Sequence, residues 1–169
     1  MRPAPALALL QRLLQEVPAR LRRLAEPGRK PSPDKWSPKE ELGHLLDSAA
    51  NNHQRMVRVR MQDGLAMPGY EQEEWVRLHS YQARDWEELI GVWSALNRQL
   101  LAAAATVPDS AWPHTCTVDG SESMTLHFVF EDYLRHMLHH LQHIGIELGD
   151  LEGGQSVDRA NDQRPTTGA

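Results

Sequence analysis

Apolar positions recur at steps of three and four residues along four long stretches of the chain, and polar segments rich in proline and glycine separate these stretches. This spacing is typical of amphipathic α-helices, which bury one face and expose the other. The stretches are residues 5–25, 38–61, 86–105 and 126–148. Four such helices predict an all-α fold, a four-helix bundle. No segment alternates apolar and polar residues for long enough to predict a strand.

Capping signals indicate where three of these helices begin. Ser37 is a favoured N-cap residue, Pro38 takes the first helical position, and Glu40 completes a capping box. Asp85 and Thr125 are equivalent N-cap residues before the third and fourth helices. We therefore expect these three helices to start within a residue of the stated positions.

Two segments depart from the simple pattern. Pro18 lies within the first stretch, where it removes a backbone donor, so it predicts a kink near Val17 or a division into two shorter helices. The connection over residues 64–84 is too long for a simple turn, and we expect a short helix within residues 71–81.

Composition narrows the class of protein. The 169 residues suffice for one domain, which we place at residues 1–150, and the polar segment 151–169 predicts a disordered tail. A net charge of −5 argues against a nucleic-acid partner. No apolar run approaches the roughly 20 residues that cross a bilayer, and no signal-peptide pattern is evident. A lone Cys116 excludes an internal disulfide and a cysteine cluster. We expect a soluble cytoplasmic protein without a membrane partner.

Histidines concentrate in the fourth predicted helix. Five of the nine are His127, His136, His139, His140 and His143. His136 and His140 are four residues apart, so on a helix their side chains lie on one face, about one turn apart. Two imidazoles at this spacing can bind one divalent metal, although surface histidines also occur four apart by chance. A metal site requires a third ligand from elsewhere in the chain.

His44 in the second helix is the strongest candidate for that ligand. It lies on a polar row with Ser48, Asn51 and Arg55, away from the apolar stripe of its helix. A metal site with His44 therefore requires a polar cleft between helices. If the second helix packs only through its stripe, His44 faces solvent.

Two motifs of the chain resemble the DinB/YfiT-like superfamily of small metal-binding bundles. One is the segment from Lys30 to Ser48, KPSPDKWSPKEELGHLLDS, and the other is the HxxHHxxHI pattern from His136 to Ile144. The segments 68–75 and 120–126 are also similar to members of this family. The resemblance covers residues 5–148.

The resemblance implies a bundle of unusual helix order, frequent homodimers, and a single divalent metal, zinc or nickel above others, bound by His44, His136 and His140. Three nitrogen ligands leave coordination positions open, as in catalytic rather than closed structural sites. Characterised members transfer low-molecular-weight thiols such as bacillithiol or mycothiol to electrophiles, or isomerise maleylpyruvate with such a thiol. Many others have no assigned reaction.

We therefore predict a metal-dependent enzyme, a thiol S-transferase or a hydrolase, that acts on a small molecule; the transferase would use a low-molecular-weight thiol cosubstrate. The alternative is a non-catalytic metal-binding or stress-response bundle that dimerises, and a third hypothesis is a bundle without metal. An open cleft leading to the histidines favours the enzyme, and a sealed site favours the second hypothesis. Catalytic and substrate-binding residues are not identified by the sequence.

Several other polar residues have an ordinary interpretation beside a functional one. Asp47 and Asp132 are candidates for hydrogen bonding to the outer nitrogens of the ligand histidines, and are equally ordinary surface carboxylates. His139 and His143 are expected to be surface or outer groups rather than ligands.

Cys116 is a poor candidate for a nucleophile, because no base or helix N-terminus is placed beside it by the sequence. The run Arg55, Arg58 and Arg60 is expected to form a solvated face, with binding of an anionic cosubstrate as the less favoured alternative. The tryptophans are expected in core and loop-anchoring positions; they are Trp36, Trp75, Trp86, Trp93 and Trp112.

Overall fold

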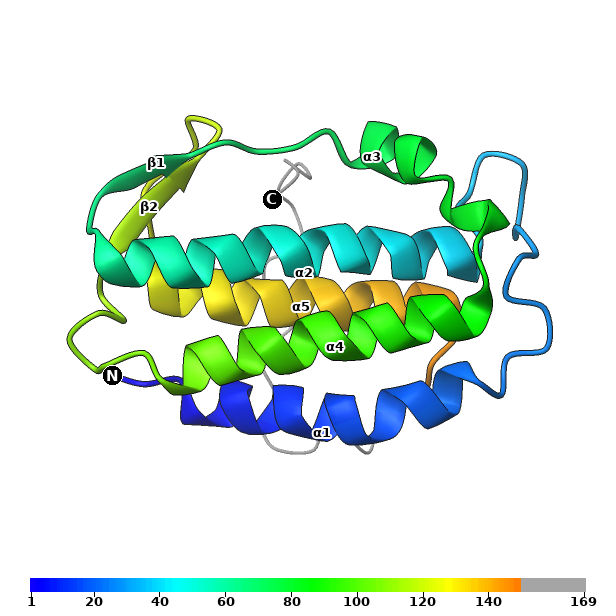
Figure 1. Ribbon diagram of the computed structural model, residues 1–169, viewed down its shortest axis with the longest axis horizontal. Helices are drawn as coiled ribbons and strands as arrows, with labels where there is room; N and C mark the ends of the chain where they lie inside the picture. The colour runs from blue at the N-terminus through cyan, green and yellow to red at the C-terminus, as the bar shows by residue number, and fades with distance from the viewer. Residues whose placement is uncertain (150–169) are drawn as a thin grey trace.

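A computed structural model describes residues 1–149 of the chain. Four long helices dominate it (Figure 1) and confirm the predicted four-helix bundle. Their bounds are α1, Ala4–Leu21; α2, Pro38–Met61; α4, Trp86–Ala105; and α5, Leu126–Ile144. The domain boundary and the tail predicted beyond residue 150 lie outside the described residues.

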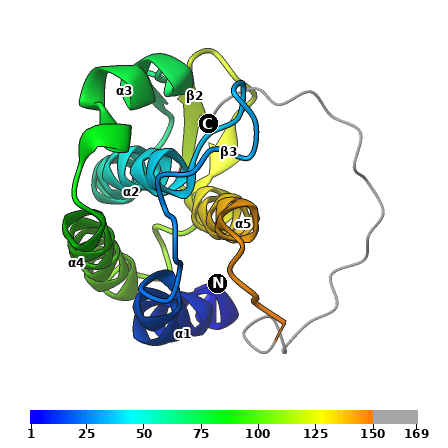
Figure 2. The same cartoon turned by 90° about the vertical axis from the view of Figure 1, so that its right-hand side faces the viewer.

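The helices are not packed in the order in which they follow one another along the chain. Both α1 and α2 pack against α4 and α5, so α1 and α2 occupy opposite corners of the bundle (Figure 2). Figure 1 shows α2 and α4 running in one direction and α1 and α5 in the other. The first half of α2 therefore lies beside the second half of α5, which is where the candidate ligands are.

The predicted caps are present. The Ser37 hydroxyl accepts a hydrogen bond from the backbone N–H of Glu40 (3.3 Å), and the Glu40 carboxylate accepts one from the backbone N–H of Ser37 (2.8 Å). Asp85 and Thr125 likewise accept hydrogen bonds from backbone N–H groups in the first turns of α4 and α5. These bonds satisfy donors that a helix start would otherwise leave unpaired.

Of the two expectations about α1, the division into two shorter helices is wrong, because α1 is a single helix despite Pro18, and the kink near Val17 stays a prediction. Pro18 lies in its last turn, so the missing N–H removes only one backbone bond near the end of the helix. Val17 and Leu21 on either side of it are fully buried. Packing of the apolar stripe keeps the helix continuous.

Within residues 1–149, three short strands correct the expectation that no segment of the chain forms a strand. They are β1, Leu65–Met67; β2, Thr115–Val118; and β3, Met124–Thr125. β2 is the central strand, parallel to β1 and antiparallel to β3. Strands of two to four residues are too short to show a convincing alternation of apolar and polar positions.

The connections also include a short helix, α3, Gln72–His79, which confirms the one expected within residues 71–81, and a 3₁₀ turn, η1, Tyr81–Ala83. α5 ends at Ile144, earlier than the apolar stripe predicts, because Gly145 adopts a left-handed conformation (φ 92°). Ile146 and Leu148 remain buried after the helix has ended.

The core lies between the four helices. Trp93 and Trp112 are fully buried, and Trp86 donates a hydrogen bond from its indole nitrogen to the carbonyl of Leu21 (3.1 Å), so these tryptophans pack or anchor as expected. Within residues 1–149, no helix combines the length and the apolar character that crossing a bilayer requires.

Candidate metal centre

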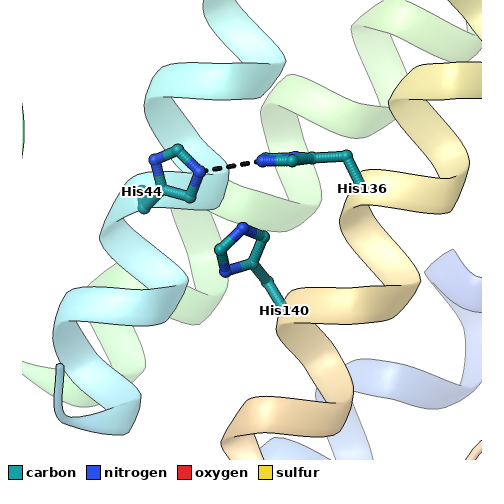
Figure 3. A group of neighbouring side chains, drawn as sticks. All are labelled: His44, His136 and His140. Atoms are coloured by element: carbon teal, nitrogen blue, oxygen red, sulfur yellow. Dashed lines mark hydrogen bonds between the residues drawn. The ribbon is translucent and has the colours of Figure 1, made fainter. Parts of the chain in front are cut away.

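Three imidazoles from α2 and α5 meet between the two helices. The Nε2 atoms of His44 and His136 are 2.9 Å apart, and the His140 ring lies 4.5 Å from the His44 ring and 4.4 Å from the His136 ring between centroids. One ring nitrogen from each histidine lies within 4.8 Å of the other two. Figure 3 shows the three rings converging across the gap between the helices. The residues named from the sequence therefore lie together, and their binding of a metal stays a prediction.

His44 does not face solvent. Its exposed fraction is 0%, because the polar row of α2 turns toward α5 and is covered from outside by aromatic residues. The Trp36 and Tyr70 rings lie 5.2 Å and 6.5 Å from the His44 ring between centroids. Trp36, expected as a core or loop anchor, thus packs directly on the histidine cluster.

The outer nitrogens of the histidines find partners that the sequence did not suggest. His140 Nδ1 lies 2.6 Å from a carboxylate oxygen of Glu41, and His136 Nδ1 lies 3.4 Å from the Ser48 hydroxyl. His44 Nδ1 has no hydrogen-bond partner among the described residues. Glu41 is therefore a member of the cluster that the sequence motifs did not indicate.

The expected outer partners are engaged elsewhere. Asp47 accepts a hydrogen bond from the Tyr81 hydroxyl (2.7 Å) and lies 3.0 Å from His79 Nδ1. Asp132 forms an ion pair with Arg135 at 2.9 Å. Neither carboxylate forms a hydrogen bond or a close ion pair with a histidine of the cluster, so their expected role as outer partners is wrong.

Burial keeps two of the imidazoles neutral. Desolvation, followed by the charges of the neighbouring histidines, lowers the pKa of His44 to about 2. Desolvation, followed by the charges of neighbouring histidines and of Arg55, lowers the pKa of His136 to about 3. Neutral imidazole is the form that binds a metal. Three imidazole nitrogens, one of them fixed by a carboxylate on its outer nitrogen, are a donor set that suits zinc and nickel. The residues present therefore fit a divalent cation.

A second group of possible ligands shares members with the first. Glu41, His140 and His143 also lie within 4.8 Å of one another. His143 is exposed, and its Nδ1 lies 3.5 Å from Glu41. Because Glu41 already pairs with the outer nitrogen of His140, we interpret Glu41 and His143 as an outer layer of the same site. His139 is exposed on the same helix, as expected.

A cavity of ≈ 30 Å³ lies beside His136. Ser48 and Arg55 of α2, Asp132 and His136 of α5, and residues of β2 and β3 line it. Arg55 is only 3% exposed, so its assignment to a solvated face is wrong. The small sheet missing from the sequence prediction covers this part of α2 and encloses the arginine.

Cys116 stays a poor nucleophile in the structure. Its side chain is buried in β2, and desolvation raises the pKa of its thiol. A protonated, buried thiol has neither the charge nor the access that nucleophilic attack requires.

Comparison with known proteins supplies a family and a fold. A sequence model described as the DinB superfamily matches residues 6–144. Among solved structures, the chain is similar to YfiT from Bacillus subtilis, described as a probable metal-dependent hydrolase with an unusual four-helix bundle topology. The TM-score is 0.62 at 19% sequence identity, over 87% of this chain and 91% of YfiT. No curated protein matches.

Proposed function

This chain belongs to the DinB superfamily, and from that premise we propose that it is a metal-dependent enzyme that acts on a small molecule through His44, His136 and His140. One observation carries the proposal: three imidazoles, two of them held neutral by burial, converge beside a cavity. A divalent cation in such a site supplies Lewis acidity, which makes water or a thiol nucleophilic near neutral pH and polarises an electrophile.

The protein's own contribution is to position the ligands and to limit access. Glu41 accepts the Nδ1–H of His140, which leaves the Nε2 lone pair directed at the other two rings. Trp36 packs on the His44 and His140 rings and shields them from water. The cavity is lined by His136 and not by Trp36, so it offers a small molecule a route to the cluster. An approach of this kind favours an enzyme over a sealed storage or structural site.

Hydrolysis and thiol transfer are each favoured by a separate observation. YfiT, whose fold the chain shares, is described as a probable metal-dependent hydrolase. Thiol transfer is favoured by the cavity lining, in which Asp132 is the only carboxylate among residues 1–149 and is already paired with Arg135. Water needs a base to accept its proton, whereas a thiol is the stronger acid and loses its proton more readily.

The test begins with metal content. Protein purified without a histidine tag or chelator is analysed by mass spectrometry beside His136→Ala and the matched control His139→Ala, an exposed histidine of the same helix. We expect about one divalent metal per chain in the native protein and the control, and none in His136→Ala. Native protein that takes up no metal after incubation with zinc, nickel or manganese would overturn the proposal.

Activity assays follow on the metal-loaded protein. Activated esters test hydrolysis, and an electrophilic dye with a low-molecular-weight thiol tests transfer. Turnover in either assay that is lost in His136→Ala and kept in His139→Ala supports that reaction. A metal-loaded protein inactive in both would favour the non-catalytic metal-binding bundle.

A homodimer and a cytoplasmic location stay predictions for this protein. Light scattering coupled to size exclusion would distinguish a chain of 19.2 kDa from a pair of chains. A monomer over the working concentration range would contradict the first prediction.

A further inference from the structure

The guanidinium of Arg55 lies buried in the wall of the cavity beside the histidine cluster. Arg55 is 3% exposed and belongs to the lining of the cavity, together with His136. Its Nη1 donates a long hydrogen bond of 3.3 Å to the side-chain oxygen of Asn52. Its Nη2 is buried and has no hydrogen-bond partner among the described residues. A cationic donor thus stands beside the candidate metal centre with unused hydrogen-bonding capacity.

Such an arrangement is costly for folding. A guanidinium has five N–H donors and stays charged at neutral pH even where burial lowers its pKa, as it does for Arg55. A buried charge without a counter-charge loses its hydration without compensation. Proteins keep such groups where a ligand supplies the missing partner, and carboxylates and other oxyanions match the planar guanidinium in charge and shape.

Among the described residues the charge of Arg55 has no close counter-ion, and Asp132 stabilises the charged guanidinium only from a greater distance. Asp132 lines the same cavity, but it is paired with Arg135, and no ion pair of 4.0 Å or less joins it to Arg55 among the described residues. Burial raises the pKa of Tyr70 to about 12, and the nearby charge of Arg55 acts on this pKa in the opposite direction. Arg55 therefore keeps an unpartnered donor in a cavity wall that it shares with His136.

The size and walls of the cavity limit what can bind there. A volume of ≈ 30 Å³ exceeds the roughly 10–15 Å³ that one water requires, and it accommodates a group of a few atoms rather than a whole cofactor. Val118, Met124 and Val129 form apolar walls. A compact anionic group that enters with a short apolar stem satisfies both features.

We propose that Arg55 binds the carboxylate of a small-molecule substrate or cosubstrate and holds the rest of that molecule against the histidine cluster. The substrate class is then a small carboxylic acid or a derivative that keeps a free carboxylate. The part of the proposal that concerns turnover rests on the proposed metal-dependent activity, whereas the anion site itself does not.

Acetate is the probe for this site, in a nuclear magnetic resonance titration of full-length protein from which metal has been removed. Without metal, acetate cannot bind to the cation, so the result is independent of the proposed activity. We expect a saturable shift of the Arg55 Nε–H signal and of Ser48 and Val118, which line the cavity. Substitution Arg55→Gln should weaken acetate binding by about tenfold or more, the size expected for a charge-assisted hydrogen bond.

Arg58→Gln is the matched control, because Arg58 lies on the same helix and its guanidinium bonds to Gln54 rather than lining the cavity. It should leave acetate binding unchanged. If circular dichroism shows that Arg55→Gln does not fold, the test rests on which signals of the native protein shift when acetate is added. Three outcomes would overturn the proposal. The first is that acetate causes no saturable shift, and the second is that the shifts are centred away from Arg55. The third is that native protein and a folded Arg55→Gln bind acetate equally well.

Discussion

Glu41 decides which nitrogen His140 presents to the other two histidines. Its carboxylate, 2.6 Å from His140 Nδ1, stabilises the tautomer with the proton on Nδ1. The Nε2 lone pair then faces His44 and His136. A carboxylate in this position also fixes the rotation of the ring, which strengthens a metal site.

Replacing Glu41 by Gln keeps the size of the side chain and removes its charge. We expect the zinc affinity to fall about 10- to 100-fold, as is usual for the loss of such an outer partner. Competition with a chromophoric chelator measures the change. Glu131→Gln, a half-exposed carboxylate of α5 that pairs with His127, is the control and should leave the affinity unchanged. Equal zinc affinity in Glu41→Gln and native protein would show that Glu41 does not support the site.

The lowered pKa values of His44 and His136 predict how the stability of the metal-free protein depends on pH. In the unfolded chain both histidines titrate near their ordinary pKa of 6.5, whereas in the folded chain they do so at about 2 and about 3. Below pH 6.5 the unfolded chain therefore binds protons that the folded chain does not. The free energy of unfolding should be flat above that pH and decrease below it, by up to about 1.4 kcal/mol per pH unit for each histidine.

Urea unfolding between about pH 7.5 and pH 5.5 measures this slope, since that range spans the ordinary pKa of histidine. The double variant His44→Asn, His136→Asn should have a shallower slope. Asp47, whose raised pKa acts in the opposite sense, is unchanged in the variant and cancels in the comparison. Identical slopes for the two proteins would contradict the prediction.

The sequence predicts which histidines lie together, but it does not predict which residues surround them. His136 and His140 are recognisable because an i, i+4 pair must lie on one face of a helix. Glu41 lies three residues before His44, so the same rule places those two side chains on one face, and this signal was available. Its contact with His140 joins residues 99 positions apart, and no local pattern predicts such a contact.

At the scale of elements, α2 is the helix whose environment differs most from that of a simple amphipathic helix. It packs against α4 and α5 and also against α3, η1 and β1. Every residue from Glu41 to Ala49 is buried. Other elements therefore cover more of α2 than its single apolar stripe predicts. For this reason neither His44 nor Arg55 faces solvent. The capped starts of the helices, in contrast, depend on a few adjacent residues and were predicted correctly.

Gly43 allows the closest of these contacts. A Cβ atom at this position would lie 2.1 Å from the ring of Tyr81, so only glycine lets η1 approach α2. The same approach brings the Tyr81 hydroxyl within 2.7 Å of Asp47. The packing of η1 thus supports the part of α2 that carries His44.

Substitution Gly43→Ala should destabilise the protein, although alanine favours a helix by about 1 kcal/mol. Displacement of the Tyr81 ring costs about 1–3 kcal/mol as overpacking, and the loss of the Asp47 hydrogen bond adds to it. Chemical unfolding measures the net loss. Gly91→Ala in α4 is the control, because a Cβ there meets no atom within 4 Å, and it should be neutral or stabilising. If the Gly43→Ala protein is as stable as the Gly91→Ala protein, the ring of Tyr81 moves aside without a cost in the free energy of unfolding.

At the scale of the whole molecule, the histidine cluster connects elements that the chain order keeps apart. His44 follows the connection across the end of the bundle, and His136 and His140 lie in the last long helix (Figure 1). A cation bound by all three would cross-link α2 and α5. Such a cross-link exists only in the folded chain, so its binding energy adds to the stability of the fold.

Zinc should therefore raise the midpoint of thermal unfolding. At a free concentration about 100 times its dissociation constant, a ligand of the folded state alone adds about 2.7 kcal/mol, which corresponds to a rise of several degrees for a chain of this length. Calcium, which prefers oxygen ligands, should cause no shift. His136→Ala should lose the response to zinc and His139→Ala should keep it. If zinc still raises the midpoint of thermal unfolding of His136→Ala, the ion binds elsewhere on the protein. That result would refute the cross-link between α2 and α5.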